Sequence, residues 1–147
     1  MSRLQTLLLW TAVPLCAFVL PQRLSAQTDV NSLATTVAAA WARHDFVTVV
    51  GGGRVELRIA GVSAAGPLPS DQAAALLTGY ARGAQEIEVG VVTATAVSDG
   101  TGYAQLRRRY RRQGVGEPRE ETILLGLVRS PGGEWRVSVV EVSGAQR

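Results

Sequence analysis

The residues most suited to chemistry in this sequence form one short segment, 107–112, which reads Arg-Arg-Arg-Tyr-Arg-Arg. Successive side chains of a strand point to opposite faces, so Arg107, Arg109 and Arg111 share one face and the residues between them share the other. Arginines on both faces indicate a strand end that extends past the core. The segment could dock a polyanion or an anionic membrane surface. The alternative is a solvated hairpin tip whose arginines pair with Glu117, Glu120 and Glu121 on the returning strand, and these nearby acids favour it.

One histidine, His44, could act as a general base. It follows a predicted helix, and no second histidine or acidic cluster accompanies it in the sequence. The pattern therefore predicts a surface histidine at a helix end. A single histidine also falls short of the three or four ligands of typical zinc sites. We expect no catalytic residue, no metal and no cofactor.

An isomerase-type site would need an acid that acts as a base and a Tyr or Asp hydrogen-bond donor inside an apolar pocket. The candidates are Glu56, Glu86, Glu88, Tyr80 and Tyr103. Glu86 and Glu88 alternate with apolar residues, which predicts that both point to solvent. Tyr80 has the helical spacing of a core residue, with its hydroxyl reaching the surface. Tyr80 and Tyr103, with the three arginines on one face, remain the candidate binding residues.

Residues 1–26 are typical of a secretory signal peptide, with Arg3 followed by an uncharged, mostly apolar run from Leu7 to Leu20. The alternative, a membrane anchor, needs about 20 apolar residues, and this run is shorter. Cleavage after Ala26 would leave Gln27 first. Lipidation at Cys16 is disfavoured because no small residue directly precedes it. We expect an exported protein, periplasmic or extracellular, without a transmembrane helix or a thiol in the mature chain.

Composition indicates one soluble domain over residues 27–147. The chain has 147 residues, of which 46% are hydrophobic and 18% charged. Its 15 basic residues are all Arg, and two of them precede Gln27, so 13 remain against 12 acids. A nearly neutral domain of this kind is not expected to bind nucleic acid specifically.

Periodicity predicts an α+β order of elements. Apolar residues at helical spacing predict a helix over 29–43, capped by Asp29 or Asn31, with Trp41 as its largest anchor. Asp45 should cap a short helix to Val50, and Ser70 a third helix that ends before Gly83. Alternation predicts strands over 54–60, 87–97, 103–112, 122–129 and 135–142, and short links between the last four predict an antiparallel meander.

This order resembles the nuclear transport factor 2-like superfamily, the cone-shaped cystatin-like α+β fold that includes ketosteroid isomerases. The resemblance is carried by segments 39–46, 55–59, 70–73 and 133–137. The chain is most similar to small uncharacterised secreted bacterial proteins of that fold. The resemblance implies helices packed on one face of a curved antiparallel sheet. A Gly/Pro loop at 61–69 replaces the second arm of the usual hairpin, and the superfamily hosts too many activities to select one.

The function expected from these features is an exported, non-enzymatic binding or interaction domain. Helices cover one side of a single sheet, whereas the strand at 122–129 carries apolar residues on both sides, including Leu124. A homodimer partner or an apolar small ligand would cover the second face, and self-association needs no further component. The alternatives are an enzyme of the ketosteroid-isomerase-like type, and a polyanion or envelope-surface binder through Arg107 to Arg112.

Overall fold

The structure, a computed structural model, describes residues 20–62 and 66–144. Most of the expected signal peptide, with Cys16, lies outside these residues. The first helix, α1 (Leu20–Ala42), starts earlier than the sequence predicts. Asp29 and Asn31 lie inside it, so neither is its cap; Pro21 stands in the first turn, where a helix tolerates proline, and no glycine lies between it and Asp29. Within the described residues, no helix combines the length and apolar character that crossing a membrane requires.

Two shorter helices follow, α2 (Phe46–Val50) and α3 (Ser70–Ala81). The predicted cap of α2 is confirmed, because the Asp45 carboxylate accepts a hydrogen bond from the Thr48 backbone N–H at 3.3 Å. The predicted Ser70 cap is wrong. Pro69 occupies the N-cap position and no side chain caps the helix, since Ser70 already belongs to its first turn. Asp71 still places a favourable negative charge there.

The sheet has five strands in the order β1-β5-β4-β3-β2. The last four form the predicted antiparallel meander: β2 (Ala84–Ala96), β3 (Thr101–Arg112), β4 (Arg119–Arg129) and β5 (Trp135–Gly144). The short β1 (Glu56–Ile59) joins the edge parallel to β5, so the sheet is mixed rather than fully antiparallel. Val55 and Leu68 form a single antiparallel bridge between the two ends of the segment that contains β1.

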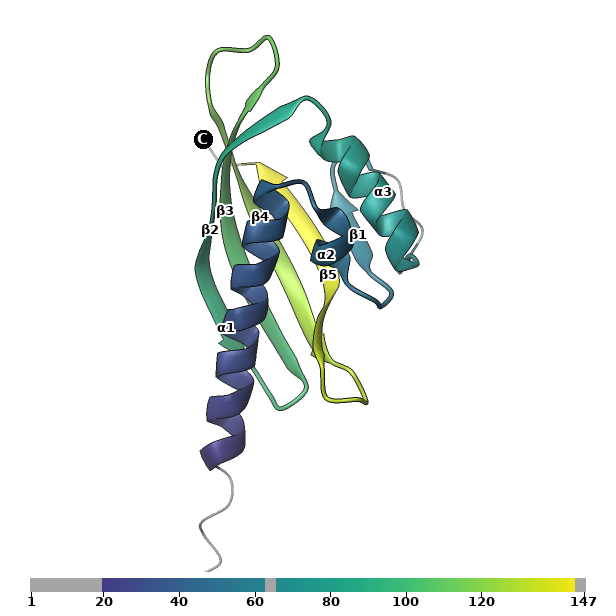
Figure 1. The fold of residues 1–147 in the computed structure, drawn as a ribbon, viewed down its shortest axis with the longest axis vertical. Helices are drawn as coiled ribbons and strands as arrows, with labels where there is room; N and C mark the ends of the chain where they lie inside the picture. Colours follow the sequence, from purple (N-terminus) through teal and green to yellow (C-terminus); the bar gives the residue numbers. More distant parts are fainter. Residues whose placement is uncertain (1–19, 63–65, 145–147) are drawn as a thin grey trace, which may run out of the picture.

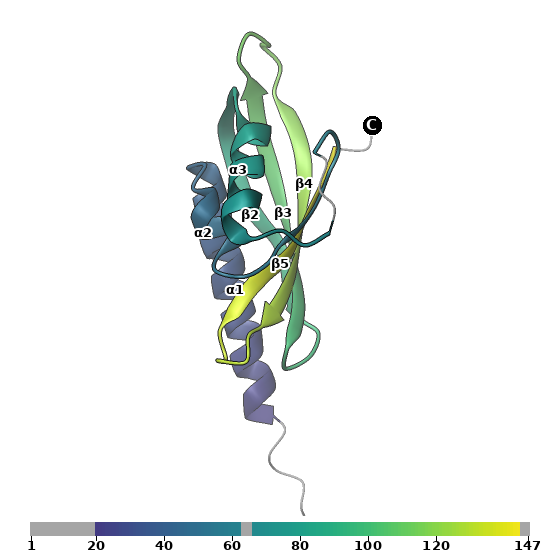
Figure 2. The same ribbon diagram turned by 90° about the vertical axis from the view of Figure 1, so that its right-hand side faces the viewer.

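All three helices lie on one side of the sheet, as Figures 1 and 2 show. The long α1 runs beside β2 and β3, while α2 and α3 pack together nearer β1 and β5. Trp41 is fully buried between these layers and contacts Phe46 edge-on, with 5.2 Å between ring centroids. Trp135, the first residue of β5, is only partly buried against the core. The fold class predicted from the sequence is thus confirmed.

Two β-bulges interrupt β2, one between Glu86 and Glu88 and one between Val91 and Thr93. At the first, Glu86 pairs with Tyr110 and Glu88 with Arg109, so Ile87 is the additional residue. An additional residue reverses the alternation of side chains along a strand. Glu86 consequently faces the helices, and Glu88 faces the open side of the sheet.

Candidate functional site

A buried arginine lies between the helices and the sheet. Arg108, in β3, has 1% of its surface exposed. Its Nε donates to both carboxylate oxygens of Glu86, at 3.0 and 2.9 Å, and its Nη1 donates to Glu121 Oε2 at 2.9 Å. Nη2 donates to Glu86 Oε1 as well. Every nitrogen of the guanidinium therefore has a carboxylate partner.

Two tyrosines complete the coordination of Glu121. The hydroxyls of Tyr80, from α3, and of Tyr110, from β3, each donate to Glu121 Oε1 at 2.8 Å. The Tyr80 hydroxyl is thus directed at the buried carboxylate and not at the surface, so that part of the Tyr80 prediction is wrong. Its placement against the core is confirmed.

His44 closes the cluster from the helix side. Its Nε2 lies 2.9 Å from Glu86 Oε1, and its ring stacks on Phe46 with centroids 5.7 Å apart. The backbone of His44 is left-handed, with φ of 55° in the turn between α1 and α2, which directs the ring back toward the sheet. His44 does lie at a helix end, with its side chain 33% exposed, but the expectation that no further acid accompanies it is wrong, because the fold brings Glu86 to it.

Aromatic rings enclose the Arg108 guanidinium. Its Cζ lies 3.9 Å from the centroid of Tyr110 and 5.7 Å from those of Trp41 and Tyr80. Burial alone would lower the pKa of Arg108, but the hydrogen bonds and charges of Glu86 and Glu121 raise it above the ordinary arginine value. Arg108 is therefore a permanent positive charge within this aromatic enclosure.

The same surroundings raise the pKa of both tyrosines. For Tyr80 and for Tyr110, burial is the larger cause, because it disfavours the charged phenolate. The hydrogen bond to Glu121 and its negative charge raise both pKa values further. Both hydroxyls therefore remain donors across the neutral range.

Two predictions are wrong, and the first of them fails because of the bulge in β2. Glu86 does not point to solvent: its side chain is 6% exposed in its ion pair with Arg108. The arginine segment does not extend past the core on both faces, because Arg108 and Tyr110 are buried. The pairing of Arg108 with Glu121 could be found from the sequence, since hairpin register sets them opposite each other. The ion pair of Arg108 with Glu86 could not be found in this way, because it depends on the bulge in β2.

The other predicted site residues lie on the opposite face of the sheet. Arg107 is exposed and lies 3.9 Å from Glu88, and Arg109 stands opposite Glu120 in the register of β3 and β4. Arg111 follows them toward the hairpin tip, and Tyr103 lies near the other end of β3. Tyr80 is thus separated from the other four candidates. Glu56, also considered, bonds Arg58 Nε at 2.9 Å on this outer face.

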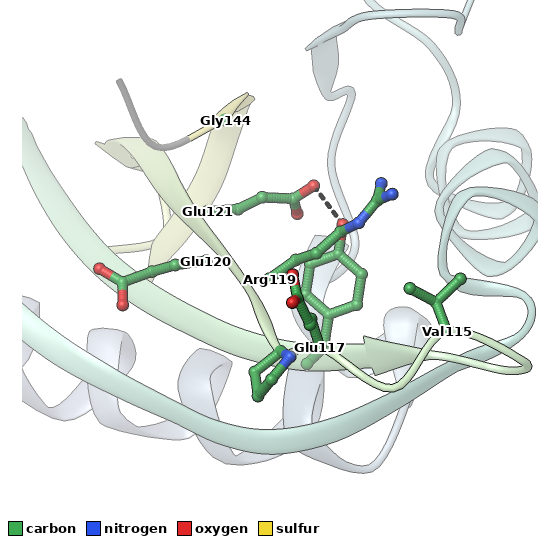
Figure 3. Close-up of a pocket in the computed structure, with 8 residues that line it drawn as sticks. Val115, Glu117, Arg119, Glu120, Glu121 and Gly144 are labelled. Carbon is green, nitrogen blue, oxygen red and sulfur yellow. Dashed lines mark hydrogen bonds between the residues drawn. The ribbon is translucent and has the colours of Figure 1, made fainter. Parts of the chain in front are cut away.

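A hollow of about 480 Å³ lies under the β3–β4 hairpin and reaches the cluster from outside. Figure 3 shows Glu121 on its wall and Glu120 pointing in the opposite direction. Glu117, Glu120 and Glu121 all line it, with Arg119 as the accompanying cation. Excess negative charge makes this hollow unsuited to the anionic partners expected of the arginine segment. In residues 20–62 and 66–144, no three His, Cys, Asp or Glu side chains converge as metal ligands would.

The polar groups of the cluster are hydrogen-bonded to one another. The guanidinium has no nitrogen left without a carboxylate, and both tyrosine hydroxyls donate inward. The polar groups that could bind a substrate between helices and sheet bind one another.

No sequence profile of a protein family matches the chain, and no curated protein matches it in sequence. Similar structures are found among solved proteins. A ketosteroid isomerase-like protein from Erwinia carotovora atroseptica superposes with a TM-score of 0.68 at 16% identity, over 82% of this chain and 97% of that one. A DUF4783 family protein from Bacteroides uniformis gives 0.62 at 9% identity, over 77% and 97% of the two chains.

A third similar structure carries the fold name that the sequence suggested. It is a nuclear transport factor 2-like protein with a cystatin-like fold from Novosphingobium aromaticivorans, with a TM-score of 0.59 at 18% identity over 84% of each chain. At such identities the likeness concerns fold and not activity. The chain has the nuclear transport factor 2-like, cystatin-like α+β fold.

Proposed function

We propose that this protein is an exported, non-enzymatic interaction domain that self-associates through the face of its sheet opposite the helices. One observation carries the proposal. Tyr103, Leu124 and Val139, from three adjacent strands, lie together on that face, where no helix of the described residues covers them.

Cross-strand register places these apolar side chains side by side. Tyr103 stands opposite Gly126, which in turn stands opposite Val139, and Leu124 occupies the neighbouring row. Tyr103 is 46% exposed, Leu124 is 37% exposed and Val139 is half-buried. We call these three side chains the outer apolar patch. Exposed aromatic and aliphatic side chains that meet on one sheet face are typical of a surface that binds another protein.

Charged residues of both signs surround the outer apolar patch. Arg107 and Arg109 lie on one side of it along β3, while Glu141 stands opposite Leu124 and pairs with Arg58 on the other side. An apolar centre with a charged rim is the usual anatomy of a protein interface. A rim with both signs also suits a second copy related by a twofold axis, because each copy offers both partners of a charge pair.

The buried cluster supports a role without catalysis. In an isomerase-like enzyme, the space between helices and sheet would admit a substrate. Here Arg108, Glu86 and Glu121 occupy that space with mutually satisfied charges, which favours a stable scaffold over an active site. The outer arginines support docking to an anionic surface less well than self-association, because Glu88 and Glu120 stand beside Arg107 and Arg109.

Sedimentation velocity of the exported protein tests self-association. We expect a dimer that Leu124→Asp converts to a folded monomer, because a charge would be buried at the centre of the interface. Val47→Asp is the matched control, since Val47 is 73% exposed on α2, on the helix side. A monomeric wild-type protein, or dissociation by both changes alike, would overturn the proposal.

Export is tested separately by the N-terminal sequence of the protein recovered from outside the cytoplasm. The expected first residue is Gln27. Its side chain bonds to the edge of β2, donating to the Ala94 carbonyl at 2.8 Å and accepting from the Ala96 N–H at 2.9 Å. A recovered chain that retains residues 7–20 would contradict the expected cleavage.

A further inference from the structure

Two adjacent residues at the start of β5 carry buried donors without acceptors. Within the described residues, neither the indole Nε1 of Trp135 nor the Nε of Arg136 has a hydrogen-bond partner. Both atoms can only donate. Folded proteins rarely leave buried donors unpaired, so two beside each other point to an acceptor from outside the chain.

Both residues line one groove. It encloses about 320 Å³ between α1, α2, the glycine turn that follows α2 and the β4–β5 hairpin. Leu33, Val49 and Val137 supply its apolar wall, and Ser130 adds a hydroxyl. A groove with an apolar wall and a few convergent donors has the character of a small-molecule site.

The glycine turn after α2 leaves room for the Arg136 side chain. A Cβ on Gly53 would overlap the Arg136 guanidinium, so this close approach requires glycine there. In the described part of the chain, no carboxylate lies within ion-pair distance of Arg136. Arg136 therefore differs from Arg108, whose nitrogens are all paired with carboxylates.

The two charged side chains that line the groove offset each other. Glu134 lies there together with Arg136, so the groove has no excess positive charge of the kind that favours phosphate or another dianion. A neighbouring hollow of about 410 Å³ shares Leu33, Glu134 and Trp135 and is also lined by Asp29, Ser32 and Gly133. It gives room for the rest of a ligand, whose apolar part would lie against the Trp135 indole and Leu33.

We propose that this groove binds a small organic monocarboxylate. The carboxylate accepts from Arg136 and from the Trp135 indole N–H, and the apolar part of the ligand lies against Trp135 and Leu33. The site lies on the helix side of the sheet. It is independent of the outer apolar patch, and the two proposals can fail separately.

Nuclear magnetic resonance on the ¹⁵N-labelled protein tests this directly, with 3-phenylpropionate as the probe. The indole N–H signal of Trp135, assigned with Trp135→Phe, and the Nε–H signal of Arg136 should shift together on titration. The Trp41 indole N–H, which is also buried without a partner, should not shift. The uncharged 3-phenylpropionamide and inorganic phosphate should cause much smaller shifts.

Two variants locate the binding. Arg136→Gln should weaken the affinity at least about tenfold, because it removes a charged hydrogen-bond donor. Gly53→Ala keeps the charge, displaces the guanidinium and should also weaken binding. Arg54→Gln is the matched control, because Arg54 lies in the adjacent turn and bonds the Pro67 carbonyl at 2.7 Å. It should leave the affinity unchanged.

Three results would each overturn the site. The first is the absence of shifts at Trp135 and Arg136 up to roughly 10 mM carboxylate, beyond the range of a specific site. The second is equal shifts with the amide, and the third is equal weakening by Arg54→Gln. The wild-type titration reports on Arg136 itself, so the test holds even if Arg136→Gln does not fold.

Discussion

Arg108 is the residue on which the interior of this protein depends. One guanidinium faces two buried carboxylates, so removing it would leave Glu86 and Glu121 charged, close together and without a cation. A buried ion pair adds little to stability compared with a well-packed apolar core, but breaking one partner from it is costly. The cluster therefore makes the arginine indispensable without making the protein unusually stable.

Arg108→Gln should destabilise the protein by about 3–5 kcal/mol in denaturant unfolding, because it leaves two uncompensated buried charges. The neighbouring Arg107→Gln is the matched control. Arg107 is 53% exposed, so its loss should cost less than about 1 kcal/mol. Equal costs for the two changes would contradict the assignment of Arg108 to the interior.

The raised pKa values of Tyr80 and Tyr110 predict how the stability of the protein changes in alkaline solution. A tyrosine whose folded pKa exceeds its unfolded value contributes stability that is complete below about pH 10 and is lost as the pH rises toward the folded pKa. The free energy of unfolding should therefore decline above pH 10. Tyr80→Phe should make that decline shallower.

Ultraviolet absorbance of the phenolate measures the ionisation of the tyrosines directly. The protein unfolded in urea is the control. Two tyrosines should ionise at higher pH in the folded than in the unfolded protein. Identical titration curves in the two states would show that the hydroxyls of Tyr80 and Tyr110 are not held by Glu121.

At the scale of elements, the bulge in β2 determines which acid joins the cluster. The additional residue, Ile87, directs Glu86 inward and Glu88 outward, although the two are separated by the spacing that normally shares a face. Local alternation predicts strands well because each strand carries its own pattern. A bulge depends on the pairing of two strands, and one strand's residues do not reveal it.

The other features of the fold also separate into those that local sequence predicts and those that depend on contacts between distant residues. The meander, the short helix after Asp45 and the helix at 70–81 could be predicted from apolar spacing and turn residues. The His44 contact with Glu86 could not, because it joins residues 42 positions apart through a left-handed turn. Nor could the groove at Arg136, where a glycine turn and the start of β5 meet only in the folded chain.

A matched pair of changes tests the bulge. Glu86→Gln should destabilise the protein by about 1–3 kcal/mol, because it weakens charged hydrogen bonds in a buried site. Glu88→Gln should change stability by less than about 0.5 kcal/mol, because Glu88 is 54% exposed. Chemical denaturation measures both. Similar effects of the two changes would mean that both carboxylates share one face, as simple alternation implies.

At the scale of the whole molecule, the two faces of the sheet have different characters. The helix side holds the hydrophobic core and the cluster in which Arg108 pairs with Glu86 and Glu121. The groove at Trp135 lies at the margin of this side. The outer side presents the outer apolar patch within a rim of both charges. A single sheet layer covered by helices on one side leaves such a face for another molecule to cover. The proposed dimer follows from that asymmetry.

Cross-linking at one introduced cysteine tests the dimer most directly, because Cys16 is the chain's only cysteine and lies in the segment expected to be removed on export. Leu124→Cys in the exported protein, treated with a short bis-maleimide at low protein concentration, should give a covalent dimer. Val47→Cys, on the helix side, should remain monomeric under the same treatment. Cross-linking from position 47 but not from position 124, or from neither, would contradict self-association through the outer apolar patch.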